Sequence, residues 1–180
     1  MSAWLFDLGN TRLKFARREG NGAISDLGSI DHHAGEDFSQ LPGDVHGDVA
    51  WVSAVASPVV RAALLAVLGP RFPRISFART ATRCDGLRIA YDVPARLGVD
   101  RFLSLLAARP QGEAILICGI GTALTLDLLD ADGLHRGGRI APSPTLMRES
   151  LHARARQLPA SGGTYAEFAD DTLNALASGC

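Results

Sequence analysis

The chain is poor in the features that mark secreted, membrane-spanning and nucleic-acid-binding proteins. Its three cysteines are widely separated and odd in number, so neither a disulfide framework nor a Cys-x-x-Cys metal site is expected. No stretch approaches about 18 uninterrupted apolar residues, and the first apolar run lacks the basic flank of a secretory signal. The formal net charge of −1 supplies no basic surface for nucleic acid or an anionic membrane. These absences predict a cytoplasmic protein that binds neither membranes nor nucleic acid directly.

What remains is the composition of a globular protein of modest size. Hydrophobic residues make up 47% and charged residues 21% of the 180 residues, a mixture that argues against a disordered or fibrous chain. A chain of this length can build one sizeable core, or two small lobes around a cleft. The histidines share no metal-ligand spacing with a nearby cysteine, so we expect solvated loop and helix positions for His32, His33, His46, His135 and His152.

The most informative stretch starts in the first apolar run and reads Asp7-Leu8-Gly9-Asn10-Thr11-Arg12-Leu13-Lys14. It combines a carboxylate, a permissive glycine, an amide, a hydroxyl and an ammonium group. Such a set suits a nucleotide phosphate with its magnesium ion, because the glycine allows close backbone approach and the carboxylate can hold hydrated Mg²⁺. The alternative is an ordinary tight hairpin, since Gly9-Asn10 is common turn chemistry and Lys14 can be a solvated charge.

The hydrophobic pattern predicts an α/β protein with an internal duplication. Strands are expected at residues 3–8, 13–16, 24–30, 50–55, 74–77, 114–118 and 123–129. Helices are expected at residues 59–68, 101–109, 145–157 and 168–177. An apolar strand, a turn containing glycine and threonine, and a departing strand occur both at the start and near residue 120, which predicts two related lobes. We place these lobes at residues 1–110 and 111–180, and expect the second, at about 70 residues, to lack C-terminal elements.

A further polar cluster lies at the start of the helix expected at residues 101–109. Gly98 permits a substrate to approach the backbone, while Asp100 and Arg101 place a base and a fixed cation where helix dipoles favour anions. Phosphoryl transfer needs a hydroxyl relieved of its proton, and positive charge to hold an anionic substrate. The alternative is that Asp100 caps the helix and Arg101 pairs with a nearby carboxylate.

Four motifs in this order resemble those of the type III pantothenate kinases, a family that includes the Bvg accessory factors. They are Asp7 to Lys14, Tyr91-x-x-Pro94-x-x-Leu97-Gly98-Val99-Asp100-Arg101, Gly121-Thr122-Ala123-x-Thr125-x-Asp127, and Gly137-Gly138-x-Ile140-x-Pro142. The resemblance covers essentially the whole chain. It implies an actin-like (ribonuclease H-like) kinase fold of two duplicated lobes, usually a homodimer. Such an enzyme phosphorylates the hydroxyl of pantothenate with ATP and so begins coenzyme A synthesis.

The resemblance also implies roles for individual residues. Asp100 would be the general base for the pantothenate hydroxyl. The pantothenate site would be lined by Tyr91, Gly98, Val99, Asp100 and Arg101, with Arg101 facing the carboxylate and Thr172 helping to close over the substrate. ATP would contact the first motif, made of Asp7, Leu8, Gly9, Asn10, Thr11, Arg12, Leu13 and Lys14, and also Thr122. Asp7 would lie near Mg²⁺ and hold it through water.

Three positions depart from the family pattern. The second phosphate motif usually begins Asp-x-Gly-Thr-Ala, and here Gly119 stands in place of that aspartate, the family's ligand for an activating monovalent cation (K⁺ or NH₄⁺). Glycine offers only its carbonyl oxygen, so the resemblance implies a weakened or absent cation site. Ser143 replaces a usual glycine, and Asp171 replaces the asparagine before Thr172.

Two other functions stay open at this point. Gly119 and the short C-terminal part favour a catalytically weak member that acts as a regulatory or ligand-sensing protein. A different actin-like kinase for a sugar or an acid is the other alternative, and the segment from Tyr91 to Arg101 argues against it.

Overall fold

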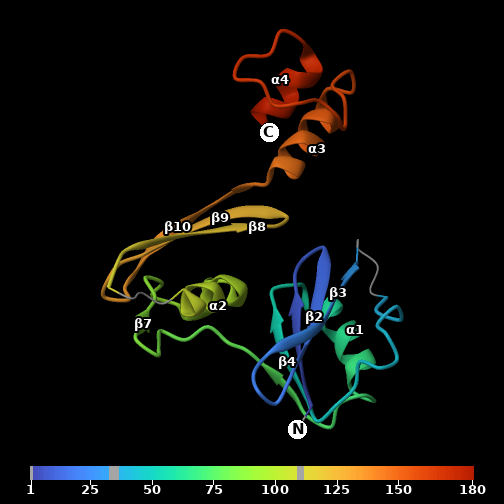
Figure 1. The fold of residues 1–180 in the computed structure, drawn as a ribbon, viewed down its shortest axis with the longest axis vertical. Coiled ribbons are helices and arrows are strands. Elements are labelled where there is room, and N and C mark those ends of the chain that lie inside the picture. The colour runs from blue at the N-terminus through green and yellow to red at the C-terminus, as the bar shows by residue number, and fades with distance from the viewer. Residues whose placement is uncertain (1, 33–36, 109–111) are drawn as a thin grey trace.

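The computed structural model describes residues 2–32, 37–108 and 112–180. The predicted lobe boundary at residues 110 and 111, the predicted helix end at residue 109, and His33 lie outside the described residues. The chain forms an α/β structure, as predicted, with sheets of five, three and two strands among these residues, and Figure 1 shows its elements along the long axis.

Within the described residues, five strands form a mixed sheet in the order β3-β2-β1-β4-β5, called here the first sheet. Its strands are β1 (Ala3–Leu8), β2 (Arg12–Arg18), β3 (Ile24–Asp31), β4 (Val49–Ala54) and β5 (Ile75–Phe77). β1 and β3 each run antiparallel to β2, whereas β1, β4 and β5 run parallel to one another. The antiparallel pairs are joined by short turns, and a helix makes the crossover between β4 and β5.

The core of this part lies between the first sheet and helix α1 (Pro58–Leu68). Side chains alternate across a strand, so Phe6 and Leu8 point into this core while Asp7 points to the opposite face. The helix begins where Ser57 accepts a hydrogen bond from the Val60 N–H, with proline at the first turn. One face of the first sheet is therefore covered by α1, and the other is free to form a site.

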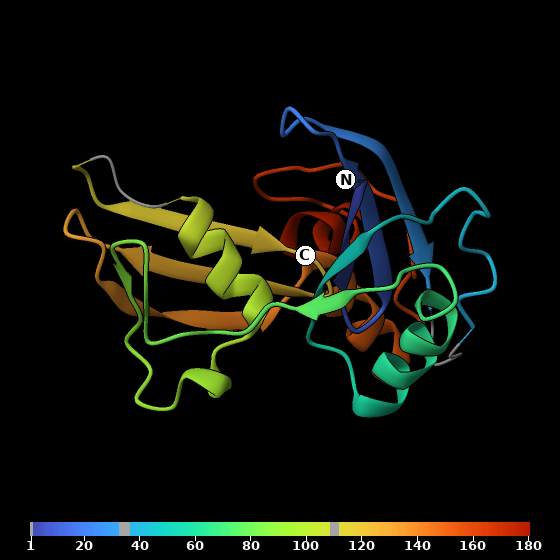
Figure 2. The ribbon, with the colours of Figure 1, turned by 90° about the horizontal axis from the view of Figure 1, so that it is seen from below.

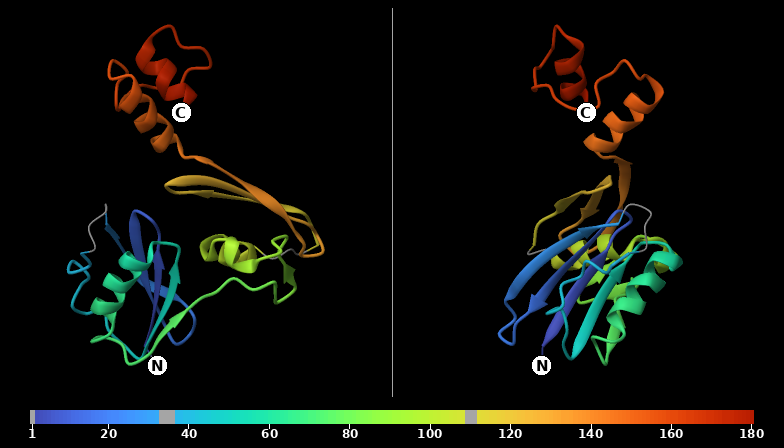
Figure 3. Two further views of the ribbon diagram at one scale, coloured as in Figure 1. Left: turned by 180° about the vertical axis from the view of Figure 1, so that it is seen from behind. Right: turned by 90° about the vertical axis from the view of Figure 1, so that its right-hand side faces the viewer.

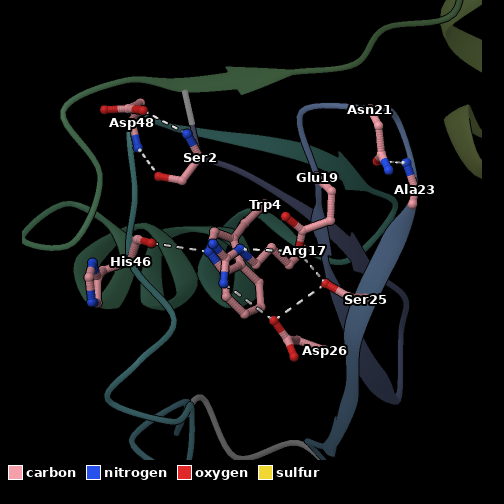
Figure 4. A network of polar contacts seen from close by, with 10 residues as sticks. All are labelled: Ser2, Trp4, Arg17, Glu19, Asn21, Ala23, Ser25, Asp26, His46 and Asp48. Carbon is pink, nitrogen blue, oxygen red and sulfur yellow. Dashed lines mark hydrogen bonds and ion pairs between the residues drawn. The ribbon is translucent and has the colours of Figure 1, made fainter.

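Polar contacts join the start of β1 to the segment before β4 in the first sheet, as Figure 4 shows. The Ser2 N–H donates to Asp48 at 2.7 Å, and the Trp4 indole N–H donates to the His46 carbonyl at 3.1 Å. The second bond satisfies the polar end of a buried tryptophan and holds the segment before β4 against β1.

Three antiparallel strands in the order β10-β9-β8 form the second sheet among the described residues. They are β8 (Ile115–Ile120), β9 (Ala123–Leu129) and β10 (His135–Pro142). Helix α2 (Val99–Ala107) lies between the two sheets and contacts β4 on one side and β8 and β9 on the other (Figures 1 and 2). A second apolar core forms here, from Leu87, Ile89, Leu97, Phe102, Leu105 and Leu129. The helix therefore connects the two halves of the molecule.

The remaining elements lie around the second sheet. A short hairpin, β6 (Arg83–Cys84) and β7 (Leu87–Arg88), and the 3₁₀ turn η1 (Pro94–Arg96) precede α2. Helices α3 (Pro144–Arg154) and α4 (Thr172–Gly179) follow β10 at the far end of the long axis, as both views of Figure 3 show. The sheet face away from α2 carries exposed apolar side chains, among them Leu116, Ile120 and Leu128.

Some sequence-based bounds were wrong, for identifiable physical reasons. No strand was expected at residues 135–142, but they form β10 because this segment pairs with β9. The last helix begins at Thr172 rather than at residue 168, since Asp171 caps it by accepting the Asn174 N–H at 3.0 Å. This hydrogen bond also lowers the pKa of Asp171. Across residues 2–32, 37–108 and 112–180, no helix has the length and apolarity to cross a membrane.

The buried face of α1 gives a direct test of this packing. Leu64 is 1% exposed and Val59 is 57% exposed on the same helix. We expect Leu64→Ala to lower the free energy of unfolding by about 2–5 kcal/mol, because it leaves a cavity against the first sheet. Val59→Ala is the matched control and should change it by less than about 0.5 kcal/mol. Urea denaturation measures both, and equal losses would contradict the packing.

Candidate active site

A cleft of about 1040 Å³ lies between the free face of the first sheet and α2. Asp7, Lys14 and Ser53 line it from adjacent strands, and the register pairs Asp7 with Lys14 on one side and Ser53 on the other. Asp100 of α2 lines the facing wall. The structure thus brings together a half-buried carboxylate, an ammonium group and a second carboxylate, which the sequence places up to 93 positions apart.

The turn between β1 and β2 is held from both sides. Gly9 donates its N–H to the Arg12 carbonyl at 3.0 Å and closes the hairpin. His32 supports the turn, because its backbone N–H donates to the Thr11 carbonyl at 2.9 Å and its Nε2 lies 3.0 Å from the Gly9 carbonyl. Its ring is buried against Phe38, so the predicted solvated position of His32 was wrong.

The corresponding turn of the second sheet meets this first turn. Thr122 lies between β8 and β9, in a turn closed by the Gly121 N–H and the Ala123 carbonyl at 3.0 Å. Its Oγ1 is 2.9 Å from Oγ1 of Thr11, across 111 positions of sequence. Both duplicated turns therefore present a hydroxyl at one place, at the junction of the two sheets.

Asp100 stands in the first turn of α2, after Gly98 at the N-cap. Its carboxylate accepts the Arg101 N–H at 2.8 Å and remains exposed to the cleft. A Cβ at position 98 would collide with Asp100 Oδ1, so glycine is needed to leave the carboxylate in this place. The helix start therefore directs Asp100 into the cleft.

The Arg101 side chain lies in a buried network and is not among the residues that line this cleft. Its Nε and Nη2 donate to the two carboxylate oxygens of Asp127 at 2.8 and 2.6 Å, and both residues are less than 10% exposed. This bidentate hydrogen bonding raises the pKa of Arg101 further above its ordinary value. Nη1 donates to the Tyr91 hydroxyl at 3.4 Å. The alternative that Arg101 pairs with a carboxylate is confirmed.

His135 and Gly138 complete this network. His135 is 0% exposed, its Nε2 lies 2.9 Å from Asp127 Oδ1, and its ring stacks on Tyr91 at 6.1 Å between centroids. Its predicted solvated position was therefore also wrong. A Cβ at Gly138 would overlap Asp127 Oδ1 and Arg101 Nη2, so the glycine of β10 gives the ion pair its room.

Comparison with known proteins decides the family. The sequence profile described as type III pantothenate kinase matches residues 4–180. The chain belongs to the type III pantothenate kinase family. Members from Stenotrophomonas maltophilia (strain K279a) and Xanthomonas axonopodis pv. citri (strain 306) are each 54% identical, over the whole of this chain and 74% of their own lengths.

A solved structure supports the fold. A Campylobacter jejuni protein assigned to the Baf family of transcriptional activators superposes with a TM-score of 0.63 at 18% identity. The match covers 98% of this chain and 72% of that protein. Together with the family match, it confirms the predicted actin-like (ribonuclease H-like) α/β kinase fold.

The other residues expected from the family motifs fall into different surroundings. Leu8 and Leu13 are fully buried in the first core, whereas Arg12 lines the cleft and pairs with Asp31. Asn10 is exposed at the turn, and Val99 is buried in α2. Thr172 opens α4, which Figures 1 and 3 place well away from α2 along the long axis. Within this chain Thr172 does not meet the other expected substrate residues, and its role stays a prediction.

The departures from the family pattern have structural consequences. Ser143 and Asp171 are the N-caps of α3 and α4, where short polar side chains are favoured. A Cβ at Gly119 would lie 2.6 Å from Thr125 Oγ1 on the neighbouring strand. Position 119 therefore offers no side-chain oxygen, and the Thr125 hydroxyl occupies the space beside it.

Sequence reasoning missed several residues around the site. Ser53 lines the cleft, and its hydroxyl is buried without a hydrogen-bond partner among the described residues. His32 contacts Gly9, which is 23 positions away, and His135 contacts Asp127, which is 8 positions away. The expected strand at 50–55 places Ser53 on the same face as Trp51, but nothing in the sequence indicated that Ser53 would lie beside Asp7.

Gly138→Ala tests the packing of the buried ion pair. The added methyl group would push apart Asp127 and Arg101, so we expect a loss of about 1–3 kcal/mol in the free energy of unfolding. Gly20→Ala is the control, since a Cβ there meets no described atom within 4 Å. Thermal and denaturant unfolding measure both variants. A Gly138→Ala protein as stable as Gly20→Ala would contradict the described contact.

Proposed function

We propose that this chain transfers the γ-phosphoryl group of ATP to the hydroxyl of pantothenate, the first step of coenzyme A synthesis. The observation that carries the proposal is the meeting of Asp7, Lys14 and Asp100 in one cleft. Membership of the type III pantothenate kinase family supports it, and the relatives carry this activity in their names.

The proposed reaction assigns a task to each wall of the cleft. Asp100 takes the proton of the pantothenate hydroxyl, whose oxygen forms a bond to the γ-phosphorus. The bond between the γ-phosphorus and its bridging oxygen breaks, and ADP leaves with that electron pair. Lys14 offsets the negative charge of the phosphates, and the hydroxyls of Thr11 and Thr122 hold their oxygens. The facing positions of Asp100 and Asp7 across the cleft support this division.

Asp7 suits a magnesium ion bound through water. Among the described residues, no group of three or more His, Cys, Asp or Glu side chains could hold a metal. Magnesium is commonly bound by one or two carboxylates together with substrate phosphates, and it would neutralise phosphate charge there. The half-buried carboxylate of Asp7 beside the turn at Gly9 fits that role.

The acceptor would lie toward the start of α2. Arg101 would meet the pantothenate carboxylate with the N–H groups that Asp127 leaves free, beside Tyr91. Gly98 and Val99 would supply backbone contacts, and Thr172 would help to close the site. We further propose a homodimer in the cytoplasm. The exposed apolar face of the second sheet supports an interface between copies, because such faces are seldom left open to water.

A catalytically weak regulatory protein is not favoured, since the proposed base, cation and phosphate turn are all retained. Another actin-like sugar or acid kinase is likewise not favoured, because the relatives at 54% identity are named type III pantothenate kinases.

Asp100→Asn tests the proposed base. The amide cannot take a proton, so we expect kcat to fall by about 10²- to 10⁴-fold with little change in the KM for ATP. Pantothenate-dependent formation of ADP is the assay, and the control is Asp44→Asn, at an exposed position outside the cleft lining. Nucleotide binding without pantothenate-dependent turnover in the unaltered protein would favour the regulatory alternative instead.

A potassium titration tests the consequence of Gly119. The residues around position 119 do not fit a cation ligand of the family type, because the carboxylate is absent and Thr125 fills the space. We expect kcat/KM to change by less than about twofold when potassium replaces choline at constant ionic strength. Activation of about tenfold or more would show that other groups bind the cation.

A further inference from the structure

A buried network of side chains lies behind the proposed pantothenate site. It joins Tyr91 before η1, Arg101 of α2, Asp127 of β9 and His135 of β10. Two of these residues, Tyr91 and Arg101, are the ones proposed to face the substrate carboxylate. The other two come from the second sheet and have no proposed contact with substrate.

Asp127 fixes the plane of the Arg101 guanidinium group. Two parallel hydrogen bonds, at 2.8 and 2.6 Å, use the Nε and Nη2 positions and leave Nη1 directed at the Tyr91 hydroxyl. A guanidinium group held by two bonds cannot rotate without breaking one of them. The direction of its remaining N–H donors is therefore set by Asp127.

His135 contacts both Asp127 and Tyr91, the two residues that hold Arg101. Its Nε2 donates to Asp127 Oδ1 at 2.9 Å, a direction that follows because a carboxylate accepts. Its ring lies parallel to that of Tyr91, with an interplanar angle of 7°. The Nδ1 atom is buried without a partner among the described residues, a cost that a purely apolar side chain would avoid.

We propose that Asp127 and His135 are positioning residues that give this site its preference for an acceptor bearing a carboxylate, by orienting Arg101 and Tyr91. This inference rests on the proposed function. The charge of Arg101 is balanced by Asp127, so recognition of the substrate carboxylate depends on directed donors more than on net charge. A merely structural role would change the stability of the protein and leave its preference for a carboxylate unchanged, so the two roles are separable by measurement.

The test compares pantothenate with its analogue in which a primary alcohol replaces the carboxylate. The readout is the ratio of kcat/KM for the acid to kcat/KM for the alcohol. His135→Leu removes the hydrogen bond to Asp127, while His135→Gln keeps an Nε2 donor, and both lose the ring that stacks on Tyr91. The pair therefore isolates the hydrogen bond.

We expect His135→Leu to lower the acid-to-alcohol ratio by about tenfold, through a higher KM for pantothenate and an unchanged KM for ATP. His135→Gln should keep the ratio within about threefold of the unaltered protein. A ratio that stays unchanged in His135→Leu, or that falls equally in both variants, would overturn the inference. Circular dichroism and thermal unfolding report whether each variant folds.

Asp127→Asn, measured alongside, keeps the inference testable if His135→Leu does not fold. It replaces one of the two oxygens that accept from Arg101 with an amide nitrogen, and should also lower the ratio, by about threefold. An unchanged ratio would again overturn the inference. A complete lack of pantothenate-dependent turnover in the unaltered protein would instead mean that the proposed function itself fails.

Discussion

The bidentate contact between Arg101 and Asp127 is the interaction on which the arrangement of the site depends. It attaches α2 to the second sheet, and α2 is also one wall of the cleft over the first sheet. Asp100 precedes Arg101 directly, so its place in the cleft follows from the way the next residue is held. Gly138 leaves room for the pair, because a side chain at this position would overlap both Asp127 and Arg101.

A second contact joins the two halves on the nucleotide side. The hydroxyls of Thr11 and Thr122 meet at 2.9 Å, one from each duplicated turn. The turn at Thr11 is in turn supported by His32, which is packed in the first core. The hydroxyls proposed to bind phosphate and the proposed base are thus held in place by separate contacts between the sheets. A kinase site of this kind exists only when both sheets are in place.

Short sequence patterns were enough to predict those parts of the candidate site whose residues are close together in the chain. The turn from Asp7 to Lys14 and the helix start at Asp100 each place their groups through backbone geometry within a few residues. The partner of Arg101 lies 26 positions away, and its choice depends on how α2 packs against β9, which no short pattern encodes. The burial of His32 and His135 was missed for the same reason, since spacing alone cannot show which polar residue will be enclosed.

Amide hydrogen exchange in the presence of Mg²⁺ and a non-hydrolysable ATP analogue tests the central claim most directly, that the two turns form one nucleotide site. The account predicts that residues 9–14 and residues 121–123 become protected together, at the same analogue concentration. Protection of one turn alone, or of neither while the analogue is bound, would contradict a site shared between the two sheets.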